Sequence, residues 1–251
     1  MRTPITPFNA AIAQVRLESP QVTTVVYETN DETLNAFTSG QFAVLRLPEG
    51  DGWSAPHPFT LSGAQGDAPQ MTIKRMGEFT SQRVPALTPG TPVQLAGPFG
   101  SFCKSFSSAE PAVFLAGGIG ITPFLSVLRT QAKTNGQKQV WLFWGLGSMQ
   151  EAIAAAELEA MTRHIPLRLV YVLSNQPDPL PLFEAAPQAS VAADKGFVCA
   201  DTLKKRHAPQ DASFYFCGPP AMYAPVLKEL ETLNISADRV QMEKFTPPST
   251  H

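Results

Sequence analysis

The sequence predicts two domains, an antiparallel β-barrel followed by an α/β domain built on a parallel sheet. The chain has 251 residues, enough for two ordinary domains, and its 43% hydrophobic content is normal for a globular protein. Short strand-like segments separated by turn residues fill the first half. After Glu110, continuous apolar runs alternate with helical patterns instead, which is typical of βαβ units.

The first half contains β-branched or alternating segments, each bounded by Gly, Pro or Ser in turn positions. Regular short strands of this kind favour a small antiparallel barrel. One short helix is expected at residues 80–87. The expected strands are residues 10–18, 23–28, 41–47, 59–62, 71–75 and 93–96.

The second half begins near residues 105–111, and we place the domain boundary between residues 108 and 109. Residues 176–188 form an irregular Pro-rich loop, and no internal repeat is present. Expected strands are residues 112–116, 140–144, 167–173, 213–217 and 239–245, with helices at 122–133, 149–163 and 220–233.

Composition argues against several classes of protein. The net charge is −2 and no Lys/Arg run occurs, so nucleic acid is not an expected partner. The three cysteines are far apart and form no C-x-x-C, which argues against a zinc site or a four-thiolate iron–sulfur cluster. The start of the chain does not resemble a signal peptide, and glycines and a proline interrupt the longest uncharged stretch. We therefore expect a cytoplasmic protein with no integral membrane segment.

The segment GGIGITP at residues 117–123 follows the first apolar run of the second half. Its glycines allow a tight turn and close approach to a ligand. Thr122 suits the N-cap and Pro123 the first helical position, so the helix would present N–H groups to a phosphate. The alternative is a tight turn that binds nothing. The predicted binding residues are Gly117, Gly118, Gly120, Thr122 and Pro123.

The segment CGPPAM at residues 217–222 lies between an apolar strand and a helix. Ligands of open parallel sheets bind outside the carboxyl ends of the strands, so Cys217 is expected at the same edge as the glycine turn. A small polarizable thiol there suits contact with a nicotinamide. The alternative is a buried small hydrophobic residue, which is the interpretation preferred for Cys103 and Cys199.

Two motifs of the first half suit a flavin. HPFT combines an imidazole, an aromatic ring and a hydroxyl, and strand alternation puts His57 and Phe59 on one face and Thr60 on the other. A flavin needs a ring to stack on, a hydrogen bond near N5 and donors for its pyrophosphate. In GEFT, Gly77 permits close approach and Thr80 can cap the short helix toward a phosphate. An ordinary half-buried strand and a plain capped turn are the alternatives.

These motifs, in order and spacing and with GPFG at residues 97–100 between them, resemble the ferredoxin–NADP reductase superfamily over nearly the whole chain. The HPFT variant is most similar to the branch of ferric reductases and of NADPH oxidase dehydrogenase domains. The resemblance implies a Greek-key β-barrel that binds FAD at residues 1–108 and an α/β domain that binds NAD(P) at residues 109–251. It also implies an oxidoreductase that takes hydride from NAD(P)H at the flavin.

The resemblance further implies roles for individual residues. Phe59 would stack on the isoalloxazine, and Thr60 would hydrogen-bond near N5. His57 stands where much of the superfamily has a pyrophosphate-binding arginine, so Lys74 or Arg75 is expected to share that role. Thr60, Cys217 and Phe245 are the implied catalytic residues, with Phe245 of the terminal E-x-F shielding the flavin until nucleotide displaces it. The other implied cofactor-binding residues are Pro58, Ser62, Gly77, Phe79, Thr80, Ser148, Gly218, Pro219 and Met222.

The choice of nucleotide depends on the segment GLGS at residues 145–148. Many relatives carry an arginine there for a 2′-phosphate, whereas Ser148 donates a hydrogen bond but neutralises no charge. This favours NADH over NADPH. A cation from elsewhere in the chain is the alternative, and the candidates are Arg163, Arg168 and Lys204.

The sequence contains no haem or iron–sulfur segment, so the electron acceptor is expected to be a separate protein with an iron–sulfur, haem or oxygenase centre. One alternative is a self-sufficient reductase of ferric chelates, quinones or free flavin. A second alternative, which is not an enzyme, is a protein that binds nucleotide without turnover. No oligomeric state is predicted.

Overall fold

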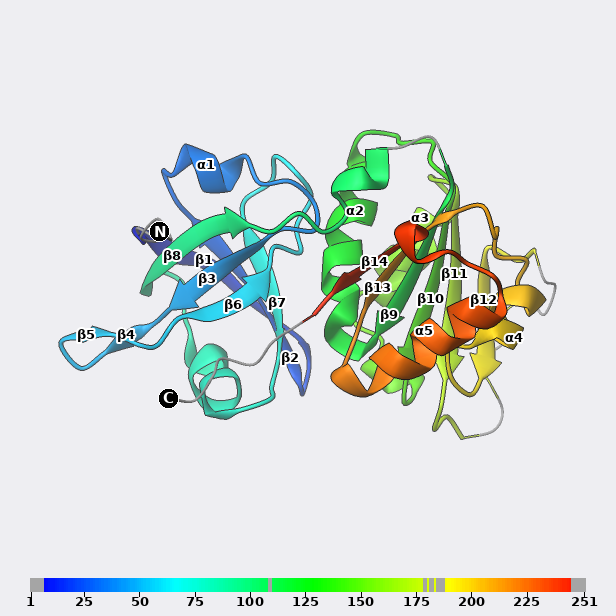
Figure 1. Ribbon diagram of the computed structural model, residues 1–251. Helices are drawn as coiled ribbons and strands as arrows, with labels where there is room; N and C mark the ends of the chain where they lie inside the picture. Colours follow the sequence, from blue (N-terminus) through cyan, green and yellow to red (C-terminus); the bar gives the residue numbers. More distant parts are fainter. Residues whose placement is uncertain (1–6, 108–109, 178–179, 181–182, 184–187, 245–251) are drawn as a thin grey trace. The chain divides into compact units, whose positions relative to one another are not determined.

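The computed structural model describes residues 7–107, 110–177, 180, 183 and 188–244, and the chain divides into two compact units (Figure 1). The first unit contains the described residues up to Lys104 together with Leu125–Thr130. The second contains Ser105–Phe124 and the described residues from Gln131 onward. The expected boundary, between residues 108 and 109, lies outside the described residues.

The first unit is built on the antiparallel sheet that the sequence predicts, with strand order β6-β3-β8-β1-β2-β7. A bridge between Leu61 and Met71 joins the two ends of that order, and it closes the sheet into a barrel. The strands are β1 (Phe8–Ser19), β2 (Val22–Glu28), β3 (Phe42–Arg46), β6 (His57–Thr60), β7 (Gln70–Lys74) and β8 (Pro92–Phe99).

Alternating side chains fill the inside of the barrel. In β3, Ala43 and Leu45 are fully buried while their neighbours are only partly covered. Val25 and Leu95 reach the same core from β2 and β8. Burying each such aliphatic side chain stabilises the fold by about 1.5–3 kcal/mol.

Three small features of this unit differ from the sequence prediction. The expected helix at residues 80–87 is a π-helical turn, η1 (Phe79–Arg83), followed by a 3₁₀ turn, η2 (Val84–Ala86). Pro85 within η2 has no N–H to donate, so a regular α-helix does not continue there. A helical turn, α1 (Glu32–Asn35), and a short hairpin, β4 (Pro48–Glu49) with β5 (Gly52–Trp53), were not expected.

The second unit is a parallel six-stranded sheet with strand order β12-β11-β10-β9-β13-β14. The five expected strands are present. The sixth, β12 (Val191–Lys195), is an edge strand of sequence VAADK whose mixed polarity gives little sequence signal. The other strands are β9 (Ala112–Gly117), β10 (Val140–Leu146), β11 (Leu167–Leu173), β13 (Ser213–Cys217) and β14 (Val240–Glu243).

Helices cover both faces of this sheet (Figure 1). Phe124 of α2 (Thr122–Lys133) stacks on Phe114 of β9, with ring centroids 4.5 Å apart. On the same face Tyr171 donates to the Glu159 carboxylate of α3 (Ala155–Met161) at 3.0 Å. Helices α4 (Ala200–Lys205) and α5 (Tyr223–Thr232) supply Leu203 and Leu230 to the opposite face.

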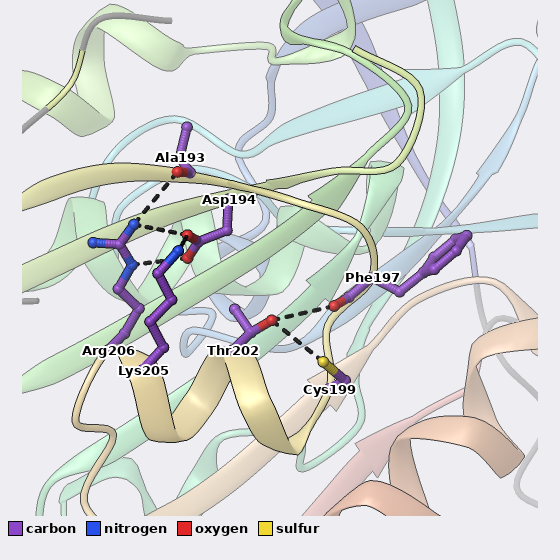
Figure 2. Close-up of polar contacts among 7 residues, drawn as sticks. All are labelled: Ala193, Asp194, Phe197, Cys199, Thr202, Lys205 and Arg206. Atoms are coloured by element: carbon purple, nitrogen blue, oxygen red, sulfur yellow. Dashed lines mark hydrogen bonds and ion pairs between the residues drawn. The ribbon is translucent and has the colours of Figure 1, made fainter. Parts of the chain in front are cut away.

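Helix α4, which the sequence did not predict, is attached to edge strand β12 by a buried ion pair (Figure 2). Arg206, directly after α4, donates from Nε and Nη2 to the two carboxylate oxygens of Asp194, both at 2.8 Å. Lys205 also contacts that carboxylate. Because the Asp194 and Arg206 side chains are both almost completely buried, the charge of each is compensated by the other.

Residues Leu125–Thr130 of helix α2 belong to the first unit, where their side chains bind the loop after β6. Ser126 donates from Oγ to the carbonyl of Gly63 at 2.7 Å, and Arg129 donates to the carbonyl of Ser62 at 2.8 Å. Thr130 accepts from the backbone N–H of Gln65 at 2.9 Å. These bonds fix the chain directly behind HPFT, and sequence patterns gave no sign of them.

Within the described part of the chain, no helix has the length and apolar character needed to cross a membrane.

Candidate functional site

The glycine turn lies at the carboxyl end of β9, as predicted. The chain passes from Gly117 through a 3₁₀ turn, η4 (Gly118–Ile121), directly into α2. Gly118 has φ +51°, and a side chain there would meet nothing within 4 Å. The backbone of residue 118 is therefore open on the side where a side chain would stand, as an approaching ligand requires.

Positions 117 and 120 have no room for a side chain, because the segment of residues 217–222 lies against them. A Cβ on Gly117 would overlap the sulfur of Met222 and lie 2.7 Å from Cδ of Pro219. A Cβ on Gly120 would overlap the carbonyl oxygen of Cys217. The structure thus brings together the two predicted nucleotide motifs, which are about a hundred residues apart in sequence.

Thr122 does not act as an N-cap, contrary to the sequence prediction. Its Oγ1 donates to the carbonyl of Ile119 at 3.1 Å, and its side chain is buried. Helix α2 begins at Thr122 itself, which puts Pro123 at the second helical position. The 3₁₀ turn runs into the helix without a break, so no extended residue separates them to serve as a cap.

The cysteines occupy three different environments. Cys217 is completely buried at the end of β13, where it pairs in register with Ala116. Cys103 is buried, as expected of a small hydrophobic residue. Cys199, directly before α4, is only half-buried, contrary to expectation. Its Sγ lies 3.4 Å from Oγ1 of Thr202 (Figure 2). The N-cap position of Cys199 explains the difference, because a helix end reaches the surface.

The carboxyl end of β10 holds a carboxylate that sequence analysis missed. A Cβ on Gly147 would overlap Oε1 of Glu151, so the glycine makes room for that side chain beside Ser148. The alternative cation Arg168 lies elsewhere: its guanidinium is 5.1 Å from the ring centre of Trp141, and the two residues pair near the amino ends of β11 and β10. That end is opposite the glycine turn.

A tyrosine secures the end of β14. The hydroxyl of Tyr223 donates to the backbone carbonyl of Glu243 at 2.6 Å, and Nζ of Lys244 lies 5.5 Å from the centre of the Tyr223 ring. Burial, helped by Cys217 and Glu243, raises the pKa of Tyr223 to about 12, so the hydroxyl keeps its proton. Burial likewise raises the pKa of the Glu243 carboxyl. The predicted shielding residue, Phe245, lies outside the described residues.

The HPFT segment forms β6 at one end of the sheet order, where it pairs with β3. Thr60 is buried, and so is Ser62, whose Oγ lies 2.9 Å from Oγ1 of Thr72. His57 and Phe59 are half-buried, and Pro58 between them is exposed. The rings of His57 and Phe59 both lie beside Phe79, as expected of two residues on one face of the strand.

Phe79 of the GEFT motif lies beside the rings of two HPFT residues. The imidazole of His57 stacks on the Phe79 ring at 3.7 Å between centroids, with an interplanar angle of 18°. The ring of Phe59 lies 6.3 Å away and nearly parallel, at 15°. Two predicted motifs thus share one aromatic cluster.

Thr80 caps a turn rather than a helix. Its Oγ1 accepts hydrogen bonds from the backbone N–H groups of Met76 and Gly77, at 2.8 and 3.1 Å. The sequence placed Thr80 at the helix start, but η1 begins one residue earlier, with Glu78 at its N-cap. The hydroxyl therefore points back to the preceding chain.

The two predicted pyrophosphate cations lie where β7 ends. Lys74 pairs with Val22, and the backbone of Arg75 donates to the carbonyl of Gln21 at 2.9 Å. The buried Nε of Arg75 has no hydrogen-bond partner among the described residues. A buried donor without a partner is costly, and an anionic ligand would satisfy it.

Comparison with known proteins supports the interpretation of the second unit. Residues 114–228 match the family model for the oxidoreductase NAD-binding domain. The reductase component of propane 2-monooxygenase from Rhodococcus jostii is 28% identical over 216 residues, which are 85% of this chain and 56% of that protein. One component of the Na(+)-translocating NADH-quinone reductase of Klebsiella pneumoniae is 31% identical over 64% of this chain and 38% of that protein. The chain thus spans about half or less of these relatives.

A solved structure extends the likeness to both units. The ferredoxin NADP+ reductase of Neisseria gonorrhoeae, with bound FAD and NADP, superposes with a TM-score of 0.72 at 22% identity, covering 94% of this chain and 98% of that one. At this identity the likeness concerns the fold. Residues 114–228 are therefore similar to oxidoreductase NAD-binding domains, and the two-domain fold of the chain is that of the Neisseria gonorrhoeae reductase.

Proposed function

We propose that this protein is an FAD-dependent NAD(P)H oxidoreductase that passes electrons to a separate acceptor. The observation that carries the proposal is the packing of the Gly117–Gly120 turn against residues 217–222 within an NAD-binding domain. Two nucleotide-binding motifs meet there at the carboxyl edge of a parallel sheet, where ligands of such sheets bind.

The residues of both units fit the groups they are proposed to hold. The open backbone at Gly118 suits a phosphate or ribose approaching the turn. In the first unit, the open space beside Gly77 and the Nε of Arg75, which has no partner within the described part of the chain, suit an anionic cofactor. Half-buried Phe59 offers a ring face for an isoalloxazine.

When bound, FAD would supply hydride acceptance from a reduced nicotinamide and one-electron transfer to the acceptor. The work of the protein is to bind, orient and exclude water. Phe59 holds the flavin plane, Thr60 offers a hydroxyl near its reactive edge, and buried Cys217 closes the nicotinamide side without bulk. No side-chain nucleophile is needed.

NADH is the proposed donor. The Glu151 carboxylate beside Gly147 and Ser148 repels a 2′-phosphate, whereas it accepts hydrogen bonds from a ribose with free hydroxyls. The distance of Arg168 from this edge removes one source of compensating charge. The Klebsiella pneumoniae relative belongs, by its name, to an NADH-quinone reductase.

The proposed acceptor is a partner protein with an iron–sulfur, haem or oxygenase centre. The likeness to the reductase component of a monooxygenase supports this choice over a self-sufficient reductase of small molecules. We further propose a domain boundary between residues 108 and 109. The three free cysteines support a cytoplasmic location.

The test is an anaerobic absorbance titration of the FAD-reconstituted protein with NADH and, separately, NADPH. The proposal expects NADH to bleach the flavin bands at lower concentration than NADPH. Phe59→Ala should lose FAD affinity together with reduction. A protein that binds FAD but is reduced by neither nucleotide would be a binding protein without turnover, and the proposal would be wrong.

A further inference from the structure

A further cation, Arg83, lies near the HPFT motif in addition to the predicted Lys74 and Arg75. Arg83, at the end of η1, places its guanidinium carbon 5.6 Å from the ring centre of Phe79. The His57 imidazole stacks on that same ring at 3.7 Å. Arg83 therefore reaches the aromatic cluster that carries the histidine of HPFT.

The Arg83 side chain is held in this position by the short hairpin. Nη1 donates to Oε1 of Glu49 at 2.7 Å, and Nη2 donates to the backbone carbonyl of Pro48 at 2.6 Å. About a quarter of the side chain is exposed, against 61% for Glu49. A guanidinium carries further N–H donors beyond these two bonds, so it can bind an additional anion without leaving its place.

The charge balance around His57 explains why such a cation matters. Burial, and then the positive charge of Arg83, lower the pKa of His57 from its ordinary value, while Glu49 opposes them. The imidazole is therefore neutral at neutral pH. Among the described residues, Arg83 and Glu49 are the charged groups that shift this pKa.

We propose that Arg83 is a binding residue for the pyrophosphate of FAD, supplying the positive charge that His57 lacks, and that Glu49 competes with the pyrophosphate for it. This inference rests on the proposed function. The planar, forked N–H donors of a guanidinium match the paired oxygens and the negative charge of a pyrophosphate. Glu49 holds the guanidinium in place and offsets part of its positive potential until the anion binds.

The competition separates this role from a purely structural one. Arg83→Gln and Glu49→Gln break the same ion pair. If the pair only anchors the hairpin, both variants change FAD affinity in the same direction. If Arg83 binds the pyrophosphate, Arg83→Gln weakens FAD binding and Glu49→Gln leaves it equal or tighter.

The experiment measures the Kd of the apoprotein for FAD and for riboflavin, which has no phosphate, by quenching of flavin fluorescence. We expect Arg83→Gln to raise the Kd for FAD about tenfold and to leave the Kd for riboflavin unchanged. Arg16→Gln is the matched control, because Arg16 forms an ion pair with Glu18 elsewhere in the barrel. Thermal unfolding checks that each variant folds.

Two outcomes overturn the inference. One is an unchanged FAD Kd in Arg83→Gln, and a loss of FAD affinity in Arg75→Gln would then assign the pyrophosphate to Arg75. The other is a parallel loss in Glu49→Gln. In both of these the wild-type protein still binds FAD, so the proposed function survives. Wild-type protein that binds neither FAD nor riboflavin defeats both.

Discussion

Gly120 and Cys217 meet backbone to backbone, since the carbonyl oxygen of Cys217 occupies the space where a side chain of residue 120 would begin. The glycine turn after β9 and the segment after β13 are thereby locked together. This contact, rather than conformational freedom, is what residue 120 requires, because a positive φ occurs at Gly118 and not at Gly120.

Gly120→Ala should destabilise the second unit by about 1–3 kcal/mol, because a backbone carbonyl has to move to admit the methyl group. Weaker NADH binding should accompany the loss. Urea unfolding and nucleotide titration measure the two effects. Gly52→Ala is the control, since the nearest atom to its new Cβ would be the Glu49 carbonyl oxygen at 3.9 Å. Equal losses in both variants would contradict the close packing at Gly120.

Charge at the end of β10 should set the nucleotide preference. Glu151→Gln removes the carboxylate beside Gly147, and Ser148→Arg adds a cation for a 2′-phosphate. The double variant should shift the kcat/KM ratio of NADPH to NADH upward by about tenfold or more, chiefly by lowering KM for NADPH. An unchanged ratio would show that the 2′-phosphate lies elsewhere.

His57 should make stability depend on pH. Burial and the charge of Arg83 lower its pKa below the ordinary 6.5, so the unfolded chain takes up a proton more readily than the folded one. The stabilising contribution is present above about pH 6.5 and is lost as pH falls below it. Urea unfolding between about pH 8 and pH 5.5 should show a smaller loss in His57→Gln than in wild type. Parallel curves would refute the assignment.

The hydrogen bond that the Tyr223 hydroxyl donates should stabilise the end of β14 measurably. Tyr223→Phe removes the donor to the Glu243 carbonyl and should cost about 0.5–1.5 kcal/mol. Amide exchange of residues 240–243 should accelerate, while that of β9 stays unchanged. Because the pKa of Tyr223 is raised to about 12, the bond should persist through mildly alkaline pH. Unchanged exchange in the variant would mean that β14 is held without it.

Removing one partner of the buried Asp194–Arg206 pair should cost more than removing both. Arg206→Met leaves a buried carboxylate with only the exposed Lys205 and should destabilise by about 3 kcal/mol. Asp194→Leu combined with Arg206→Met should recover most of that loss in urea unfolding. A double variant as unstable as the sum of the singles would contradict this account.

The contribution of the same pair to stability should be lost in acid. Burial by itself raises the pKa of Asp194, but the hydrogen bonds from Arg206 and Lys205 outweigh it and hold the pKa below 3.8. The contribution is present above that value and is lost as pH falls through the lowered pKa. Acid unfolding of Asp194→Asn should lack this step.

The sequence alone determined the fold class and most of the elements. The apolar runs at residues 112–116 and 167–173 are easily recognised because parallel strands buried on both faces consist mainly of apolar residues, and a glycine turn follows the first run. The motifs HPFT, GEFT, GGIGITP and CGPPAM specify local chemistry, so the candidate residues could be named from them.

Only the tertiary structure decided which groups meet. Strand β12 and helix α4 depend on the Asp194–Arg206 contact, which no local pattern encodes. The roles of Thr122 and Thr80 changed because a shift of one residue in a helix start redirects a hydroxyl. Three candidate residues were identified only from their contacts in the structure. These contacts are Arg83 with Phe79, Glu151 with Gly147, and Tyr223 with Glu243. Contacts between residues far apart in the sequence arise from packing of the whole chain. Sequence patterns reflect only the requirements of local structure, such as strands, helices and turns.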